Sequence, residues 1–513
     1  MVAAARSTVQ VTVGLDMIDK LSWVAAYPEI LLLVMTCVIA MADLGVKSVK
    51  RSSTYIITLL TLAALSIINA AYAMNGETII AFGGMVISDP MGHWLKSFAS
   101  LAMFITLIYG RDYACDRGML RGGELFTLSL FALLGMYIMM SGHHFVVLYL
   151  GLELLTLSSY ALVALRRDNA NASEAAMKYF VLGAMASGFM LYGLSMMYGA
   201  TGSLDVAVVS QQLTTGEADS RVLALGVVFV VAGLAFKLGA APFHMWVPDV
   251  YDGAPTAVTL MIAGAPKLAA FAIVMRLLVE GMLPMALDWQ QMLGILAVAS
   301  LLVGNLAAIA QTNVKRMLAF STIAQMGFVL LGMVAGVNDG TASNALNAYS
   351  ATMFYMVTYV LTTLATFGVI LLLNQSNFEV EKLSDLAGLN QRSPMMAGVL
   401  AASMFSLAGA PPMVGFYAKL SVLQALLESN EAAYIYLGIF AVLMSLVGAF
   451  YYLRIVKLMY FDAPSGEQTA MGIHAPAEAK LVLGLNGLSL LVFGLVPSGL
   501  MVLCAQAITE LLV

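Results

Sequence analysis

Charged residues are scarce in this sequence. Only 10% of its 513 residues are Asp, Glu, Lys or Arg, whereas 61% are hydrophobic. Soluble domains carry about 25% charged residues, so a chain of this composition cannot cover itself with a water-facing surface. It can cover a lipid-facing surface. The net charge is only −5, and no basic patch indicates binding to nucleic acid.

Motifs for redox or metal chemistry are also missing. The three cysteines, Cys37, Cys115 and Cys504, lie far apart and form no CxxC or Cys/His cluster. We therefore expect no iron–sulfur or zinc site in this chain. No glycine-rich nucleotide-binding motif follows a predicted strand. The first residues lack a compact apolar core followed by a small-residue cleavage site, so we expect no cleaved signal peptide.

Long apolar runs fill most of the sequence. A membrane-spanning helix needs about 20 mostly apolar residues, and about fourteen segments meet that requirement. They lie near 25–44, 54–74, 92–110, 124–141, 143–165, 175–200, 222–248, 256–279, 290–311, 315–336, 345–373, 395–427, 432–459 and 480–511. The predicted fold class is an all-α polytopic membrane protein.

The loop charges predict the orientation, because cytoplasmic loops are enriched in Lys and Arg. With the N-terminus outside, one set of loops holds fifteen basic residues: Lys47, Lys50, Arg51, Arg111, Arg117, Arg121, Arg166, Arg167, Lys315, Arg316, Lys382, Arg392, Arg454, Lys457 and Lys480. The other side holds three, namely Arg6, Lys20 and Arg221. This asymmetry predicts a multi-pass protein of the bacterial inner (plasma) membrane with both termini in the periplasm.

Two of the basic residues inside the spans, Lys96 and Arg276, lie near helix ends. Long side chains at such positions can reach the membrane surface, so we expect both to snorkel. Depth alone predicts the same for Lys178.

Four ionisable residues lie deeper: Glu153, Lys237, Lys267 and Lys419. A charge at mid-membrane costs at least about 2.5 kcal/mol, so such residues usually have a function. The alternative is a static salt bridge that holds helices together. One glutamate cannot neutralise three lysines, and a buried lysine without a partner can release its proton. The set therefore indicates a proton relay.

Two spans are predicted to be broken helices. Residues 395–427 would make a helix of about 50 Å, whereas the hydrocarbon core is about 30 Å thick. Pro411 and Pro412 lie inside it, and Pro242 lies inside 222–248. Proline removes a backbone donor and clashes with the preceding turn, so an unwound segment is expected at each site.

The two breaks are five spans apart, which is typical of inverted repeats in transporters. We expect three N-terminal helices in 1–123, a five-helix repeat in 124–279, a second inverted five-helix repeat in 280–459, and a cytoplasmic connector with the last helix in 460–513. His244, next to the first break, can change its charge near neutral pH and is a further relay candidate. A hydrogen-bonded structural role is the alternative.

Five stretches carry a resemblance to a known family: LYLGLELLTLSSYALVAL, EAAMKYFVLGAMASGFMLYG, AFKLGAAPFHMWVPDVYDGAPTAVT, NVKRMLAFSTIAQMGF and LAGAPPMVGFYAKL. The chain resembles the antiporter-like membrane subunits of respiratory complex I and related cation/proton antiporters over nearly its whole length. Within this family it is most similar to the subunit N group. The subunit M group places a glutamate where this chain has Lys419.

The resemblance implies roles for individual residues. Glu153 and Lys237 would form the coupled pair of the first half-channel, and Lys267 would be the central relay lysine. Lys419 would be the exit-side group of the second half-channel, and Lys178 would match another lysine implicated in function.

The resemblance also implies a role in a proton-pumping NADH:quinone oxidoreductase. NADH, FMN, iron–sulfur clusters and quinone would bind to partner subunits, with no cofactor in this chain. The expected partners are other membrane-arm subunits and the lipid bilayer. Three alternatives stay open: a stand-alone or Mrp-type cation/proton antiporter, a purely structural membrane-arm subunit, and a membrane subunit of a hydrogenase-type complex.

Overall fold

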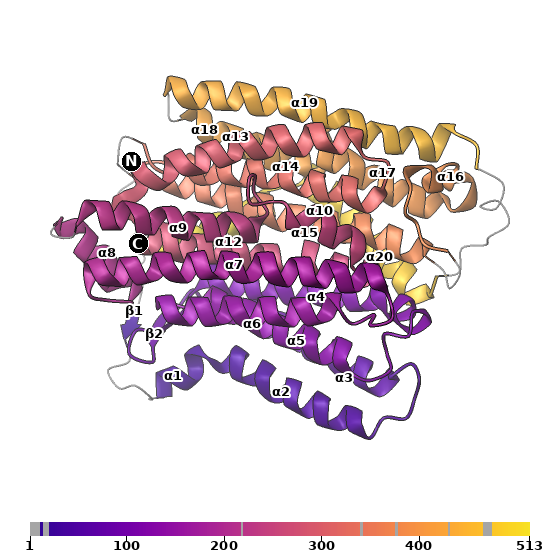
Figure 1. Ribbon diagram of the computed structural model, residues 1–513, viewed down its shortest axis with the longest axis horizontal. Helices are drawn as coiled ribbons and strands as arrows, with labels where there is room; N and C mark the ends of the chain where they lie inside the picture. Colours follow the sequence, from indigo (N-terminus) through magenta and orange to yellow (C-terminus); the bar gives the residue numbers. More distant parts are fainter. Residues whose placement is uncertain are drawn as a thin grey trace.

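The computed structural model describes residues 11–13, 20–216, 219–338, 342–374, 378–428, 431–464 and 475–512. Long helices run side by side along one direction, and the loops gather at the two ends of the bundle (Figure 1). A small sheet at one end has the order β1-β2-β3. Its strands are Val11–Val13, Thr78–Ala81 and Val86–Ser88, with β1 parallel and β3 antiparallel to β2. This sheet was not predicted.

The helices of the first half are α1 (Lys20–Ala25), α2 (Tyr27–Leu44), α3 (Ser52–Asn75), α4 (Pro90–Asp116), α5 (Glu124–Ser141), α6 (Phe145–Val163), α7 (Ala170–Thr201), α8 (Val206–Thr215), α9 (Ser220–Leu238), α10 (Trp246–Gly253), α11 (Thr256–Ala263) and α12 (Pro266–Val274). A π-helical stretch, Met275–Gly281, continues α12, and a 3₁₀ turn, Leu283–Met285, follows.

The second half contains α13 (Ala286–Ala310), α14 (Val314–Val334), α15 (Ala345–Leu373), α16 (Leu389–Arg392), α17 (Pro394–Ala408), α18 (Val414–Glu428), α19 (Ala432–Phe461), α20 (Ala477–Leu495) and α21 (Ser498–Leu512), with a 3₁₀ turn at Leu383–Leu386. Most of the predicted connector 461–478 lies outside the described residues.

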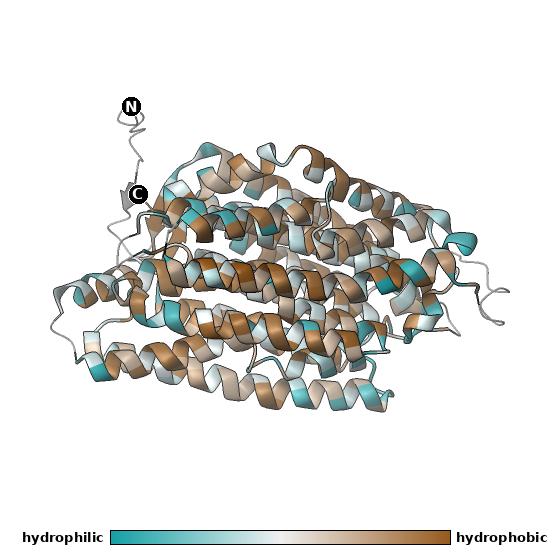
Figure 2. Ribbon diagram, turned by 90° about the horizontal axis from the view of Figure 1, so that it is seen from above, coloured by the Kyte–Doolittle hydropathy of each residue, from teal (hydrophilic) through white to brown (hydrophobic). Residues whose placement is uncertain are grey.

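The predicted membrane-spanning architecture is confirmed. Thirteen helical segments of the described chain are long and apolar enough to cross a membrane. The pair α17–α18 supplies the fourteenth, since each half alone is too short. Apolar residues dominate the middle of the bundle and polar residues gather towards its ends (Figure 2). The division into two inverted repeats stays a prediction.

Three membrane-spanning segments form the centre of the bundle. In the most apolar 18-residue stretch of each segment, all residues of α14 are buried and 94% are buried in α15 and in Thr256–Gly281, whereas 17% are buried in α19. Figure 1 shows α19 along one edge and α2 along the opposite edge. The outer helices therefore present apolar side chains to their surroundings, and the central helices can carry polar groups away from lipid.

Both predicted helix breaks are present, between α9 and α10 and between α17 and α18. Two further spans are interrupted. Residues 256–281 change direction at Gly264, and the last span divides into α20 and α21. Gly494 at the end of α20 lies against the carbonyl of Pro412 so closely that no side chain would fit. The last span thus packs its interruption against the second break.

Candidate functional site

The first break begins where α9 ends. Gly239 has φ +81°, a left-handed conformation that glycine adopts without strain, and its N–H donates to the carbonyls of Ala235 and Phe236. Pro242 follows and cannot continue the helix. The N–H of Ala241 donates to Ser300 Oγ on α13 at 2.9 Å. The chain is therefore unwound yet held in place, and the last carbonyls of α9 remain open.

Lys267 occupies that open helix end. It lies in the first turn of α12, is 2% exposed, and its Nζ donates to the carbonyl of Leu238 at 2.7 Å. The ring of Trp246 lies 5.8 Å from Nζ. A cation is favoured at a helix C-terminus because the last carbonyls carry partial negative charge. Lys267 therefore binds the carbonyl of the residue that follows Lys237 in the chain.

Lys237 and Glu153 lie near each other without contact. Lys237 is in the last turn of α9, and Glu153 is on α6. Their charges interact, but no ion pair within 4.0 Å joins them among the described residues. Lys237 Nζ and Glu153 Oε1 are both buried without a hydrogen-bond partner. Because unpaired buried polar groups are costly, their presence here indicates a functional site. The structure therefore places the two residues of the predicted pair near each other, but they form no direct ion pair.

Serine and threonine residues beside Glu153 do not extend this site. Thr156, Ser158 and Ser159 donate to the carbonyls of Leu152, Leu154 and Leu155 in their own helix. They satisfy themselves locally, as hydroxyl residues inside helices commonly do.

The second break repeats the backbone geometry of the first. Gly409 has φ +84°, and its N–H donates to the carbonyls of Phe405 and Ser406. Pro411 and Pro412 follow before α18 starts at Val414. Each break thus has a left-handed glycine at the end of a helix, and the predicted prolines lie in the unwound segment that follows.

Lys419 binds the open end of α17. Its Nζ donates to the carbonyls of Leu407 at 2.8 Å and Ala408 at 3.0 Å, and to Ser445 Oγ on α19 at 2.8 Å. A cavity of about 10 Å³ adjoins Lys419. It is lined by Gln325, Tyr355, Thr358, Tyr359, Thr362, Ser406, Leu407, Gly415 and Ala418. A space of this size and polarity is at the lower limit for one water molecule.

Helix α15 carries buried polar residues beside Lys419 that sequence reasoning missed. Helix α15 contacts both α12, which carries Lys267, and α18, which carries Lys419. Its Thr362 lies 3.2 Å from Ser406 between the two hydroxyl oxygens, and Tyr359 donates to a threonine of α14 at 2.9 Å. The available signal was the density of Tyr and Thr in SATMFYMVTYVLTTLAT, within a span that is otherwise apolar.

Gln325 joins this polar group from α14. It accepts a hydrogen bond from Tyr355 and donates to the carbonyl of Leu407 at 3.1 Å, the same carbonyl that binds Lys419. It also donates to Tyr452 on α19 at 2.9 Å. Polar side chains of α14, α15 and α19 therefore surround the second break.

The two further relay candidates lie in different places, Lys178 on α7 and His244 within the first break. Lys178 is in the third turn of α7, with its side chain 45% exposed, and pairs with Glu174 at 2.8 Å and Asp249 at 2.9 Å. This position fits the surface placement that depth alone predicts. His244 lies in the unwound segment after Gly239, half-buried, with its ring 6.5 Å from that of Phe320.

The expectation that Lys96 and Arg276 snorkel is wrong. Lys96 is 1% exposed and its Nζ lies 2.7 Å from Glu29 Oε1. Arg276 is 0% exposed and pairs with Asp89 at 2.6 Å and with Glu280. Each buried cation is paired with an acidic residue near the end of a membrane-spanning helix. The pairing offsets part of the cost of removing the charge from water. The acids were visible in the sequence, but their pairing depends on packing between helices.

An apolar helical bundle with buried lysines at two broken helices defines an antiporter-like membrane protein. Residues 142–445 match the model of the family described as NADH:quinone oxidoreductase/Mrp antiporter, transmembrane. NADH-quinone oxidoreductase subunit N of Polaromonas naphthalenivorans is 65% identical over 495 residues, covering 96% of this chain and 99% of the relative. Subunit N of Herminiimonas arsenicoxydans is 55% identical over 497 residues, covering 96% and 99%. The chain belongs to this family, in the group of NADH-quinone oxidoreductase subunit N.

Solved structures share the fold. A chain of respiratory complex I from Thermus thermophilus with bound aureothin has 31% identity and a TM-score of 0.76, covering 93% of this chain and 99% of that chain. A chain of the Mrp complex from Dietzia sp. DQ12-45-1b has 20% identity and a TM-score of 0.80, covering 96% and 98%. The second likeness shows the fold alone.

Proposed function

We propose that this chain translocates protons as a membrane-arm subunit of an NADH:quinone oxidoreductase, with Lys237, Lys267 and Lys419 as proton carriers. One observation carries the proposal. Lys267 and Lys419 each bind the open carbonyl end of a broken helix, and α15 with its hydroxyl groups lies between them. A lysine held by a helix end is stabilised as a cation, and a change at that end would release its proton.

The open Glu153–Lys237 pair supplies the coupling in this proposal. Because the two charges interact without direct contact, a small movement of α6 against α9 changes the energy of the lysine's proton. Lys237 precedes the residue whose carbonyl binds Lys267, so a movement at the end of α9 would affect both lysines. The proton would then pass along α15 towards Lys419. Lys178 and His244 would act at the approaches to this route rather than on it.

Partner subunits would hold the redox groups. Clusters of three or more His, Cys, Asp or Glu that could hold a metal ion are absent from the described residues. NADH, FMN, iron–sulfur clusters and quinone would act in neighbouring subunits, and other membrane-arm subunits would contact this chain. The names of the relatives and the complex I likeness support this assignment.

We further propose the inner membrane as the location, with the arginine-rich loops in the cytoplasm and both termini in the periplasm. The predicted loop charges support this orientation. A Lys457→Cys variant tests it, because a membrane-impermeant thiol reagent should label that cysteine only from the cytoplasmic side. Labelling only from the periplasmic side would reverse the assignment.

The test of the function uses Lys237→Ala and Glu153→Ala separately in the assembled complex. We expect normal assembly with strongly reduced proton pumping and reduced NADH:quinone turnover. Lys457→Ala is the matched control, since that lysine is 69% exposed and far from the breaks. Full pumping in both variants would favour a purely structural subunit. Cation/proton exchange by the isolated chain in liposomes would favour a stand-alone antiporter.

A further inference from the structure

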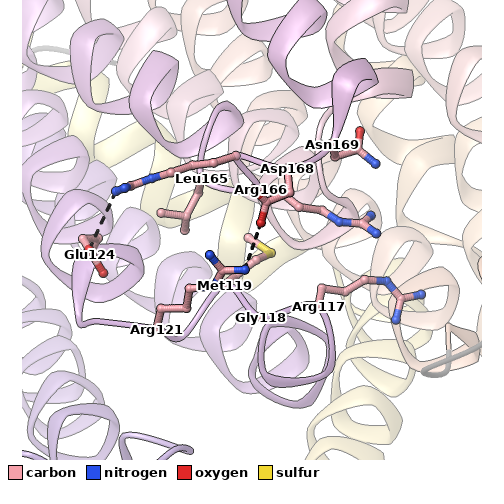
Figure 3. Close-up of a pocket in the computed structure, with 10 residues that line it drawn as sticks. Arg117, Gly118, Met119, Arg121, Glu124, Leu165, Arg166, Asp168 and Asn169 are labelled. Atoms are coloured by element: carbon pink, nitrogen blue, oxygen red, sulfur yellow. Dashed lines mark hydrogen bonds and ion pairs between the residues drawn. The ribbon is translucent and has the colours of Figure 1, made fainter.

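A basic cavity lies at the end of the bundle where α4 is joined to α5 and α6 to α7. Its volume is about 300 Å³ (Figure 3). It is lined by Arg117, Gly118, Met119, Arg121, Glu124, Leu165, Arg166, Arg167, Asp168 and Asn169. Four arginines therefore face two carboxylates. The proton route uses none of these residues, so the cavity needs a separate explanation.

Two arginines on the inner wall of the cavity approach one buried carboxylate. Arg117 Nε and Arg166 Nη1 both approach Glu379 Oε2, at 3.6 and 3.8 Å, which is longer than a hydrogen bond. Glu379 Oε1 already accepts hydrogen bonds from Tyr113 at 2.8 Å and Thr256 at 3.0 Å. The Glu379 carboxylate thus pairs electrostatically with two arginines but accepts a short hydrogen bond from neither at Oε2.

Glu379 stays ionised in this surrounding. Burial raises its pKa, but Lys315 and the hydrogen bonds from Tyr113 and Thr256 lower it further, so the pKa lies below its ordinary value. Lys315 is itself 5% exposed and adds a third cation to the cluster. Below the cavity these cations and Glu379 form one charge network, which Asp252 and Glu381 join beside Lys315.

The rim of the cavity can open. Arg121 pairs with Asp168 at 2.9 Å, and Arg167 approaches Glu124 at 4.0 Å; both pairs are drawn as dashed lines in Figure 3. The arginine side chains are each 76% exposed. Exposed pairs of this kind are weak, so a stronger anion can displace the carboxylates and take both guanidinium groups.

The helices that run from the cavity are apolar on their exposed side. Leu157 on α6 is 54% exposed, and Met177 and Phe180 on α7 are 64% and 47% exposed. The cavity itself lies at the helix ends, at the level where the polar headgroups of a bilayer would meet the protein. A ligand with a negative head and an apolar tail would satisfy both features together.

We propose that this cavity binds the phosphate of an anionic phospholipid, whose acyl chains lie along α6 and α7. Guanidinium groups bind phosphate oxygens in pairs, and basic pockets between membrane helices suit lipid headgroups. The apolar surface below the cavity favours a lipid over a free phosphate. It also favours a lipid over an acidic segment of a protein, which would not need that surface.

The experiment uses the purified complex that contains this chain, in nanodiscs, with a photoreactive phosphatidylglycerol as the probe. Peptide mapping should find the label in the loops 117–124 and 164–169. Photoreactive phosphatidylcholine is the matched neutral probe. The double variant Arg121→Gln/Arg167→Gln should label about tenfold less, since each basic residue near an anionic lipid contributes several-fold in affinity. Lys457→Gln removes an exposed charge elsewhere and should label normally.

Several results would overturn the proposal. Equal labelling by the two lipids, or unchanged labelling in the double variant, would mean that the arginines select no headgroup. Loss of the phosphatidylglycerol label in millimolar inorganic phosphate would indicate a free phosphate site. Failure of the complex to assemble in the single variant Arg121→Gln would indicate that an acidic protein segment occupies the cavity instead.

Discussion

The two helix breaks share one backbone design but differ in the origin of their lysine. Each has a left-handed glycine, at φ +81° and +84°, followed by proline. At the first break the open carbonyl of Leu238 binds Lys267, which comes from a separate helix. At the second break Lys419 belongs to the continuation of the broken helix itself.

The hydrogen bonds of the two lysines differ as well. Lys267 makes one described hydrogen bond, to a backbone carbonyl, whereas Lys419 makes three, one of them to Ser445. Lys267 binds the carbonyl of the residue after Lys237, while Lys419 adjoins a small polar cavity. The first site therefore ties a lysine to the end of another helix, and the second places a lysine beside neighbouring hydroxyl groups.

The largest expected effect comes from removing the lysines. Lys267→Ala and Lys419→Ala should each lower proton-coupled turnover about tenfold or more, because a positioned proton carrier typically contributes at least that much. Lys419→Ala should also lower the yield of assembled complex more, since it leaves two backbone carbonyls without their cation. Turnover per assembled complex, with Lys457→Ala as control, measures both. Equal yields would remove this difference between the sites.

Replacing each left-handed glycine by alanine should distinguish the effect of backbone strain on stability from an effect on proton pumping. Gly409→Ala and Gly239→Ala each force a left-handed alanine, which costs roughly 1–2 kcal/mol of stability. The new Cβ at 409 would lie 2.9 Å from Lys419 Cδ, whereas at 239 it would lie 2.8 Å from Val247 Cγ2. We expect both to lower the thermal midpoint, but only Gly409→Ala to reduce pumping strongly. Equal pumping losses would contradict the distinction.

Two serines offer a matched pair with opposite outcomes. Ser300→Ala leaves the buried N–H of Ala241 without an acceptor, at a cost of about 1–3 kcal/mol, and should mainly lower stability. Ser445→Ala removes one acceptor of Lys419 and should mainly slow pumping, by a few-fold. Thermal unfolding and pumping rates of the two variants check this. The reverse assignment of effects would show that the sites do not differ as described.

The smallest effect is expected at α15. Tyr359→Phe removes a hydroxyl that lines the cavity beside Lys419 and donates to Thr322, with little change in volume. Pumping should fall about twofold, since a hydrogen bond at the weak end of the usual range contributes about 0.5 kcal/mol. Tyr349→Phe, on the same helix but outside this cavity, is the control. An equal loss in the control would mean that α15 acts through packing alone.

Much of this architecture was predictable because the membrane limits the options. Apolar length predicts the spans, and Pro242, Pro411 and Pro412 predict the breaks. The position of Lys237, Lys267 and Lys419 deep within apolar spans predicts that they are candidates for a proton relay. The placement of Lys267 at the end of α9 was not predictable, because it depends on how α12 packs against a distant break.

Other features required the assembled bundle for the same reason. The pairing of Arg276 with Asp89 joins residues 187 positions apart. The contact between Gly494 and the second break, and the hydroxyl groups of α15 around Lys419, also depend on packing between helices. Sequence periodicity indicates which residues are polar or buried, but not which of them meet.

The most direct test is Lys419→Arg. Arginine keeps the positive charge at the helix end but does not release its proton at physiological pH. The adjoining cavity gives the larger side chain space. Protons pumped per NADH oxidised should be measured in vesicles at matched amounts of assembled complex. We predict normal assembly and a clear loss of pumping; a wild-type ratio would show that Lys419 carries no proton.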